Sequence, residues 1–508
     1  MYSTVVSAAL YGMEVILVTA EIDISQGLPG FQMVGYLGSE VREAGERVRI
    51  ALKNAGFRLP PMRFTINLSP ANIRKAGTAF DLPIAVGILL ALEYIPKDRV
   101  ERLMVAGELS LNGQIHAVQG VLPLVLKAKE EGISRCMIPA ENYREGRMVE
   151  GMEIIGVSSL EHAISYFLDG KTEEWEGEGG DGSVEQEIGD FSEIAGQEGA
   201  KRAAEIAAAG FHNLLLIGPP GSGKTMIAKR IPGILPPLTK EESLEVSSVY
   251  SIAGMLSQRK QLISCRPFQD PHHSITPQAL AGGGRIVRPG VVSLAHKGVL
   301  FLDELPEFKS GIVDLLRQPL EEKKIQISRL EGSYWFPADF MFVAAMNPCP
   351  CGYYPDRNRC RCSTGSIHRY QARVSGPVLD RMEIAAPVSM IPMEQLGAEG
   401  ENSERIRGRV MKARQIQEER YRDRGYLFNA QMPGVDMEIS CPRTAAAEKL
   451  LKKAYECIGM SARGYYRVLR TARTIADLEE KEQINEYHLS EALECRMAGR
   501  EYWEGGSR

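Results

Sequence analysis

The sequence lacks a hydrophobic run of the length that crosses a membrane. Its longest apolar stretch, Leu82–Leu92, is too short to span a bilayer and is interrupted by Pro83 and Gly87. Residues Met1–Ala20 lack the basic start and the small-residue cleavage site of a secretory signal peptide. We therefore expect a cytoplasmic protein with no membrane partner.

The chain also has no excess of positive charge. Its 508 residues include 60 Lys and Arg against 65 Asp and Glu, a formal net charge of −5. The 44% hydrophobic and 25% charged residues are ordinary for a globular protein. Because no basic footprint covers the whole chain, any contact with DNA must use local patches.

The cysteines do not form the even-numbered framework of a disulfide-rich secreted protein. There are nine, and four of them fall in two C-x-C pairs, Cys349/Cys351 and Cys360/Cys362, with eight residues between the pairs. Four thiolates in one short loop suit a closed tetrahedral Zn²⁺ site; a cluster of free thiols is the alternative. Because the cluster follows Asn347, a metal there is expected to fix the loop that carries Asn347.

The length predicts about three domains, and the patterning predicts an α/β protein. Residues 1–169 and 191–395 alternate short apolar strands with helices, and the second block has the signature of a parallel sheet. Residues 170–190 are rich in Gly and Glu and predict a flexible linker. Residues 396–508 are predicted to be all-helical, with helices at Glu404–Arg424, Ala445–Cys457, Arg463–Glu479 and Glu486–Met497.

One glycine-rich segment has the spacing of a phosphate-binding loop, between the apolar strand Asn213–Ile217 and a helical stretch. Backbone N–H groups of such a loop close around phosphates, Lys224 is expected to reach the β- and γ-phosphates of ATP, and Thr225 to ligate Mg²⁺. A glycine-rich turn without a ligand is the alternative, which the strand–loop–helix context disfavours. The predicted nucleotide-binding residues are Gly218, Pro219, Pro220, Gly221, Ser222, Gly223, Lys224, Thr225 and Met226.

Two carboxylates end a second apolar strand, Gly298–Leu302, about 80 residues after the glycine loop. At a strand's carboxyl end they face the crevice where ligands bind. Asp303 is expected to hold Mg²⁺ through water, and Glu304 to polarise the attacking water. Asn347, which follows the strand Phe340–Ala345, is placed to bind the γ-phosphate or that water.

Two arginines are candidates for cations that stabilise the transition state, Arg381 and Arg463. Arg373 and Arg470 are weaker rivals for these roles. Without the surrounding motifs, Arg381 and Arg463 would be interpreted as ordinary surface residues. His272 and His273 are expected to have turn or supporting roles, and Arg317 and Cys265 to be ordinary fold residues.

Together these motifs resemble an AAA+ ATPase of the magnesium-chelatase-like group, and more closely the bacterial ComM/YifB competence-protein family. The resemblance spans nearly the whole chain. Besides the glycine loop, it is carried by Asp190–Gln197 (DFSEIAGQ), Arg266–His273 (RPFQDPHH), Gly282–Gly284, Arg288–Gly290, Ser293–Glu307, Asn347–Gly352, Ser375–Arg381 and Arg470–Asp477.

The resemblance implies roles for single residues. Asn347 would be sensor 1, Arg381 an arginine finger that reaches a neighbour's ATP, and Arg463 the sensor 2 arginine of a helical lid. A finger acting on a neighbour implies a homo-oligomeric ring, with six subunits expected. The first block resembles the Lon-protease C-terminal domain, but Asp81 and Leu122 stand near the positions of the Ser–Lys dyad. We therefore expect no proteolysis.

Two segments resemble hairpin inserts that point into the pore of related ring helicases. They are residues 282–290, with Arg285 and Arg288 expected at the tip, and residues 323–336, expected to turn at Glu331-Gly332. Basic hairpins in a pore would follow a phosphate backbone with little sequence preference. For any one of these residues a solvated turn charge is an equal alternative. The candidate DNA contacts are Arg285, Arg288, Lys323, Lys324 and Arg329.

Two functions follow. The first is an ATP-driven DNA motor that resembles the ComM-type branch-migration helicases of natural transformation and recombination, acting on single-stranded or branched DNA. The second is a chelatase-like or chaperone-like remodeller of protein partners. The complete set of hydrolysis residues argues against a pure scaffold.

Overall fold

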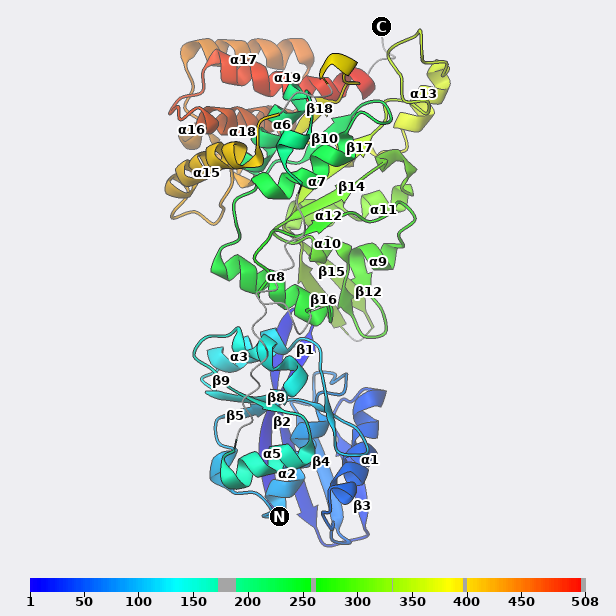
Figure 1. Cartoon of the computed structure of the whole chain (residues 1–508), viewed down its shortest axis with the longest axis vertical. Helices are drawn as coiled ribbons and strands as arrows, with labels where there is room; N and C mark the ends of the chain where they lie inside the picture. Colours follow the sequence, from blue (N-terminus) through cyan, green and yellow to red (C-terminus); the bar gives the residue numbers. More distant parts are fainter. Residues whose placement is uncertain (172–188, 257–261, 331, 396–399, 504–508) are drawn as a thin grey trace.

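The computed structural model describes residues 1–171, 189–256, 262–330, 332–395 and 400–503. Most of the predicted linker 170–190 lies outside these residues. An N-terminal domain, a central domain and a helical lid follow one another along the long axis of the molecule (Figure 1). No helix in these ranges is both long and apolar enough to cross a membrane.

The N-terminal domain is built on one mixed sheet of seven strands in the order β3-β4-β2-β1-β5-β8-β9. Its long central pair is antiparallel, and β5, β8 and β9 continue it in parallel. The strands are β1 (Tyr2–Tyr11), β2 (Glu14–Ser25), β3 (Gly30–Val34), β4 (Arg63–Ser69), β5 (Leu103–Val105), β8 (Arg135–Pro139) and β9 (Glu153–Val157). The helices are α1 (Ser39–Asn54), α2 (Asp81–Ala91), α3 (Val121–Glu130), α4 (Tyr143–Arg147) and α5 (Leu160–Asp169).

The longest apolar run of the sequence forms α2, a core helix of this domain. Nearly all its side chains are buried because it is apolar on every side, as expected of a helix enclosed by protein. The carboxylate of Asp81 at its start is buried and accepts two hydrogen bonds from Arg47, at 2.8 and 2.9 Å. Leu122 is buried in the hydrophobic cluster around α3. Asp81 and Leu122, which stand near the positions of the Ser–Lys dyad, are therefore both part of the packed interior of this domain.

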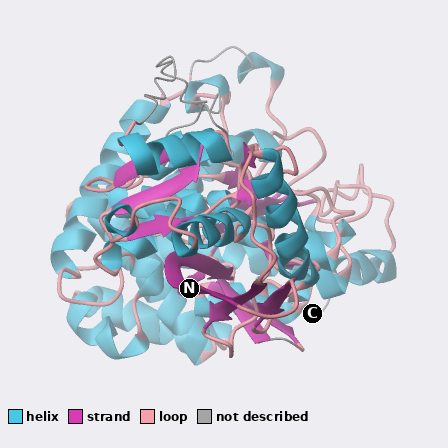
Figure 2. Ribbon diagram, turned by 90° about the horizontal axis from the view of Figure 1, so that it is seen from below, coloured by secondary structure: helices cyan, strands magenta, loops and turns pink. Residues whose placement is uncertain are grey.

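The central domain holds a parallel sheet of five strands in the order β11-β14-β17-β10-β18, which confirms the predicted architecture. The strands are β10 (Leu214–Ile217), β11 (Phe268–Gln269), β14 (Val299–Leu302), β17 (Met341–Met346) and β18 (Ile384–Pro387). The helices are α6 (Glu198–Gly210), α7 (Lys224–Ile234), α8 (Lys240–Ile252), α9 (Pro277–Ala281), α10 (Val291–Leu294), α11 (Ser310–Asp314), α12 (Arg317–Glu322), α13 (Thr364–Gln371) and α14 (Gly376–Leu379). Figure 2 shows helices on both sides of the strands.

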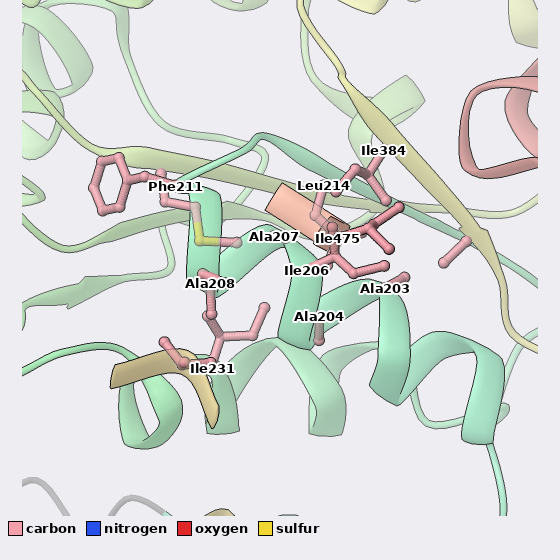
Figure 3. Packing of buried hydrophobic residues seen from close by; sticks show 14 of the residues in the cluster. Ala203, Ala204, Ile206, Ala207, Ala208, Phe211, Leu214, Ile231, Ile384 and Ile475 are labelled. Atoms are coloured by element: carbon pink, nitrogen blue, oxygen red, sulfur yellow. The ribbon is translucent and has the colours of Figure 1, made fainter. Parts of the chain in front are cut away.

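The lid packs on the alanine-rich helix α6. Small side chains such as Ala203 and Ala207 let α6 approach β18 and the lid closely, where Ile384 and Ile475 complete the core (Figure 3). The lid helices are α15 (Ser403–Arg420), α16 (Met437–Ser440), α17 (Ala445–Ile458), α18 (Ala462–Leu478) and α19 (Glu486–Trp503).

Two hairpins of the central domain reach toward the N-terminal domain. They are β12 (Gly282–Gly283) with β13 (Arg288–Pro289), and β15 (Lys324–Arg329) with β16 (Gly332–Pro337). Figure 1 shows β12, β16 and α8 at the junction with β1 and α3. The backbone N–H of Gly120 donates to Ser251 O at 3.1 Å, and that of Met13 donates to Trp335 O at 3.2 Å.

Candidate active site

The glycine loop lies between β10 and α7, as the sequence predicts. Gly218 must be glycine because a Cβ there would lie 2.0 Å from Val388 O, and Gly221 and Gly223 have φ of +74° and +96°. The hydroxyl of Ser222 is buried and has no hydrogen-bond partner among the described residues. Such an unpaired buried donor, beside a helix N-terminus, fits a loop shaped for a phosphate. Met226, the third residue of α7, is exposed.

Lys224 is held inside this loop. Its Nζ donates to the carbonyls of Gly218 and Pro219, at 2.9 and 2.8 Å, and to Asn347 Oδ1 at 3.2 Å. Burial lowers the pKa of Lys224, while Asp303 and Glu304 act in the opposite direction. The structure thus brings the predicted lysine and the predicted sensor residue into direct contact.

The two carboxylates follow β14 at the same edge of the sheet. Thr225 Oγ1 donates to Asp303 Oδ2 at 2.6 Å, so the two expected Mg²⁺ ligands are adjacent. The side chain of Glu304 is exposed and its backbone is left-handed, with φ of 52°. A strained backbone at a carboxylate is typical of functional sites. This pair of oxygens suits Mg²⁺, a hard cation that prefers oxygen ligands and, when bound, would neutralise phosphate charge.

Sequence reasoning did not assign Asp270, which follows β11 at the same edge. Burial raises the pKa of its carboxyl, Lys229 at 3.7 Å opposes that shift, and the nearby Asp303 adds to it. Its place directly after a strand in the RPFQDPHH segment was the available signal. Nearby, His272 Nδ1 lies 2.8 Å from Ser274 Oγ in a turn, in agreement with the expected supporting role.

The four clustered cysteines converge as the sequence predicts. Their sulfur atoms all lie within 4.8 Å of one another, with 3.4 Å between Cys349 and Cys351 and 3.8 Å between Cys349 and Cys360. These separations are far beyond a disulfide bond and bracket the value of about 3.8 Å that Zn–S bonds of 2.3 Å give in a tetrahedron. The donor set therefore fits Zn²⁺.

The cysteine loop contacts the phosphate-binding loop directly. Gly352 has φ of +83°, and a Cβ on it would lie 2.3 Å from Pro220 Cδ. Gln371 donates to Pro348 O at 3.1 Å and ties the loop to α13. The cluster thus supports the part of the candidate nucleotide site that carries Asn347.

The two candidate arginines lie at the opposite edge of the sheet. Arg381 and Arg463 both line a cavity of about 580 Å³ with Arg467 and Arg470. Residues that precede four strands line the same cavity: Asn213, Lys297, Asp339 and Glu383. Because the sheet is parallel, the glycine loop and Asp303 lie at the other ends of these strands, about 13 Å away for a four-residue strand.

Within one chain, therefore, Arg381 and Arg463 do not meet the glycine loop. Arg381 pairs with Glu321, and Arg463 is exposed. Of the rivals, Arg470 lines the same cavity and donates to Met432 O at 2.8 Å, whereas Arg373 pairs with Glu307, three residues after Glu304, at 3.1 Å. Arg373 thus lies at its own chain's carboxylate edge, and Arg470 is engaged by backbone.

Two of the five candidate DNA contacts are engaged in ion pairs. Lys323 pairs with Asp339 at 3.2 Å, and Arg285 pairs with Glu40 of the N-terminal domain at 3.2 Å. Arg288 lies in the paired strand β13 and not at the tip, which corrects the expectation for that hairpin. Arg329 approaches Gly283, and Lys324 is exposed on β15. Of the expected turn Glu331-Gly332, Glu331 is outside the described residues.

The comparisons with known proteins agree with this geometry. The family models that match are described as "Subunit ChlI of Mg-chelatase" over residues 20–142, "Magnesium chelatase, subunit ChlI" over 190–396 and "Magnesium chelatase, subunit ChlI C-terminal" over 400–496. The fold and site therefore define an AAA+ ATPase of the magnesium-chelatase type, a class that implies ATP and Mg²⁺.

Relatives that match along nearly the whole chain identify the family within this class of ATPases. The chain is 42% identical over 503 residues to competence protein ComM of Haemophilus influenzae, with 97% of each chain covered. It is 39% identical over 501 residues to YifB of Escherichia coli, with 98% of this chain and 97% of YifB covered. The chain belongs to the ComM/YifB family.

A more distant similarity concerns part of the chain. This chain is 27% identical over 173 residues to Lon protease 2 of Bacillus subtilis, and the match covers 32% of this chain and 31% of that protease.

Proposed function

We propose that this chain is one subunit of a ring, of six copies, that couples ATP hydrolysis to movement along DNA or to branch migration. The observation that carries the ring is the division of the hydrolysis residues between two edges of one sheet. A head-to-tail contact would bring one chain's arginine edge to the next chain's glycine loop, and such heterologous contacts close into rings.

In this proposal each complete site has two parts. One chain supplies Lys224 for the phosphates, Thr225 and Asp303 for Mg²⁺, Glu304 for the attacking water and Asn347 for the γ-phosphate. The neighbour supplies Arg381 and Arg463, which stabilise the charge that develops during hydrolysis. Exposure of Arg463 and the position of Arg381 before β18 support these two over Arg470 and Arg373.

We also assign Zn²⁺ to Cys349, Cys351, Cys360 and Cys362, where it is a structural ion. The distances among the sulfur atoms support this. With four thiolate ligands the ion has no open position, so its effect on hydrolysis is exerted through the contact of Gly352 with Pro220.

DNA is supported as the cargo by the name of the relative, a competence protein, and by two hairpins that carry basic residues. The alternative is a remodeller of protein partners, favoured by the chelatase family models over residues 190–396 and 400–496. A ring of either kind uses the same hydrolysis residues, so the cargo must be tested directly.

The deciding experiment is steady-state ATPase activity of the wild type and of Glu304→Gln, each with and without single-stranded and branched DNA. We expect DNA to stimulate the wild type, the stimulation to fall as salt rises, and Glu304→Gln to bind ATP without turnover. Vigorous hydrolysis that no DNA changes would reject the DNA motor and favour the protein remodeller.

A further inference from the structure

The β15–β16 hairpin has an exposed tryptophan in the middle of a strand. Trp335 is 44% exposed, whereas tryptophan side chains are on average highly buried in folded proteins. Its neighbours in β16 are covered: Phe336 is fully buried, and the Tyr334 ring lies 4.3 Å from that of Tyr11. The exposure of Trp335 therefore belongs to one face of the hairpin and not to a loosely packed strand.

The two faces of this hairpin differ in composition. Side chains alternate in direction along a strand, so Ile325, Ile327, Tyr334 and Phe336 share the inner face and pack with Ile252. The outer face carries Trp335 opposite Gln326, together with a lysine and two serines. Its exposed members are Lys324, Gln326, Ser328, Ser333 and Trp335.

The chemistry of the outer face selects its ligand. It has one large aromatic ring, one cation, and amide and hydroxyl groups, and none of the five side chains is a carboxylate. Lys324 makes no ion pair with the described residues, whereas Lys323 and Arg285 are both paired. A surface for an apolar protein partner would carry several hydrophobic side chains, but Trp335 is the only one among these five.

The backbone that carries Trp335 is fixed before any ligand arrives. Trp335 is in register with Gln326 of β15 on one side, and its carbonyl accepts from Met13 N of the β1–β2 turn at 3.2 Å on the other. Gly12 allows this approach, since a Cβ there would lie 2.9 Å from Trp335 O. Because the backbone of Trp335 is already ordered, little backbone entropy is lost when its ring binds a ligand.

We propose that Trp335 is a base-stacking residue for single-stranded DNA, and that Lys324 neutralises a phosphate of the same strand. This inference rests on the proposed function and names the form of DNA that the hairpin holds. A duplex presents base edges in its grooves, whereas a single strand exposes the base faces that an indole ring can stack on.

The test uses the fluorescence of Trp335 in the full-length chain. The other two tryptophans, Trp175 and Trp503, are replaced by phenylalanine, so that all tryptophan emission comes from Trp335. Addition of oligo(dT) should quench this emission to saturation, at the DNA concentrations that stimulate ATPase activity in the same preparation, and added salt should reverse it. A blunt duplex of equal length should quench much less.

Substitutions give a second measurement. Trp335→Ala should weaken oligo(dT) binding roughly tenfold, and Trp335→Phe should weaken it less because a smaller ring remains. The matched control is Leu330→Ala, which removes another exposed hydrophobic side chain of the same hairpin and should leave affinity unchanged. Circular dichroism of each variant establishes that the fold is retained.

Three outcomes would overturn the inference. ATPase stimulation by oligo(dT) with unchanged Trp335 emission, and unchanged affinity in Trp335→Ala, would reject the stacking role while the DNA motor stands. Emission that changes on ring assembly and not on addition of DNA would assign Trp335 to a subunit contact. If neither emission nor ATPase activity responds to DNA, the proposed function and this inference fail together.

Discussion

His212 shows how one buried side chain links stability to pH. It is fully buried between the central domain and the lid, with Nε2 2.8 Å from Thr474 Oγ1. Burial, and secondarily the charge of Arg470, lowers the pKa of His212 to about 3. In the unfolded chain the pKa of histidine is about 6.5. Above that pH the side chain is neutral in both the folded and the unfolded state, so the contribution of His212 to stability is fully present. This stabilisation is lost as the pH falls from about 6.5 toward 3.

We expect the free energy of unfolding to fall below pH 6.5 with a contribution from His212 of up to about 1.4 kcal/mol per pH unit. The change to test is His212→Gln, which removes the titrating group. Denaturant unfolding at pH 7 and pH 5 should show a smaller difference for this variant than for the wild type. If the difference between pH 7 and pH 5 is the same in both proteins, the protonation of His212 does not contribute to the loss of stability.

Other residues could be assigned from the sequence because they stand at fixed offsets from a strand. Lys224, Asp303 and Asn347 each follow an apolar strand, and parallel strands end at one edge, so their convergence was predictable. The partners of Arg285 and Lys323 were not, since Glu40 is 245 positions away from Arg285 in sequence and Asp339 precedes a different strand. The first pair depends on how two domains pack and the second on how a hairpin folds back onto its own domain, and no local pattern encodes either.

At the scale of elements, the cysteine loop and the phosphate-binding loop act as neighbours. Cys360→Ser should release about one zinc per chain and lower the melting temperature by about 5 °C or more, because a three-cysteine site holds the metal less well. The KM for ATP should rise, since Gly352 would no longer support Pro220. Metal analysis, calorimetry and ATPase kinetics give the three readings.

The control for this variant is Cys457→Ser. Cys457 is exposed and lies outside the cluster, so its loss should leave zinc content, melting temperature and KM unchanged. A Cys360→Ser protein with full zinc content and wild-type kinetics would contradict the structural role of the cluster.

The β1–β2 turn is a second element with a specific packing requirement. Gly12→Ala combines a left-handed backbone, φ of +69°, with a contact of 2.9 Å to Trp335 O. We expect a loss of stability of about 1–2 kcal/mol from the backbone alone and release of the β15–β16 hairpin in addition. Faster tryptic cleavage at Lys324 and Arg329 would report that release.

Gly56→Ala separates these two effects. Gly56 has φ of +90°, and a Cβ added there would meet no atom within 4 Å, so the substitution strains the backbone without touching the hairpin. It should destabilise the protein without exposing Lys324 or Arg329 to trypsin. Equal cleavage of both variants would show that the turn does not hold the hairpin.

The element pattern itself was largely predictable. The four helices expected in the lid are confirmed as α15, α17, α18 and α19, because they are long helical segments and three of them begin at a side-chain cap, such as Ser461 before α18. The direction of the two hairpins was less predictable. Each was recognised as an insert, but docking on β1, the β1–β2 turn and α1 depends on contacts such as Tyr11–Tyr334, between segments more than 300 residues apart.

At the scale of the whole molecule, the two edges of the central sheet can be tested by mixing subunits. Lys224→Ala removes the half of a site that is proposed to bind phosphate, and Arg381→Ala removes the half that is proposed to act on the neighbour. Each variant alone should be inactive. In an equal mixture of random rings about a quarter of the interfaces join two intact halves, so ATPase activity should partly return.

The matched control for mixing is Lys224→Ala with Glu304→Gln. Both changes fall on the glycine-loop edge of the chain, so no interface in the mixture has an intact half of that kind. Activity in the first mixture and none in the second would support the shared site. If the first mixture stays inactive, Arg381 does not act across an interface.

The proposed division of the hydrolysis residues between two edges of one sheet also prevents a single subunit from hydrolysing ATP. Dilute, newly made chains would carry ATP without consuming it, because the arginine edge of each lies on the far side of its own sheet. Turnover per chain would then rise steeply with protein concentration and level off when rings are complete. Self-association, as much as any ligand, would decide when this protein hydrolyses ATP.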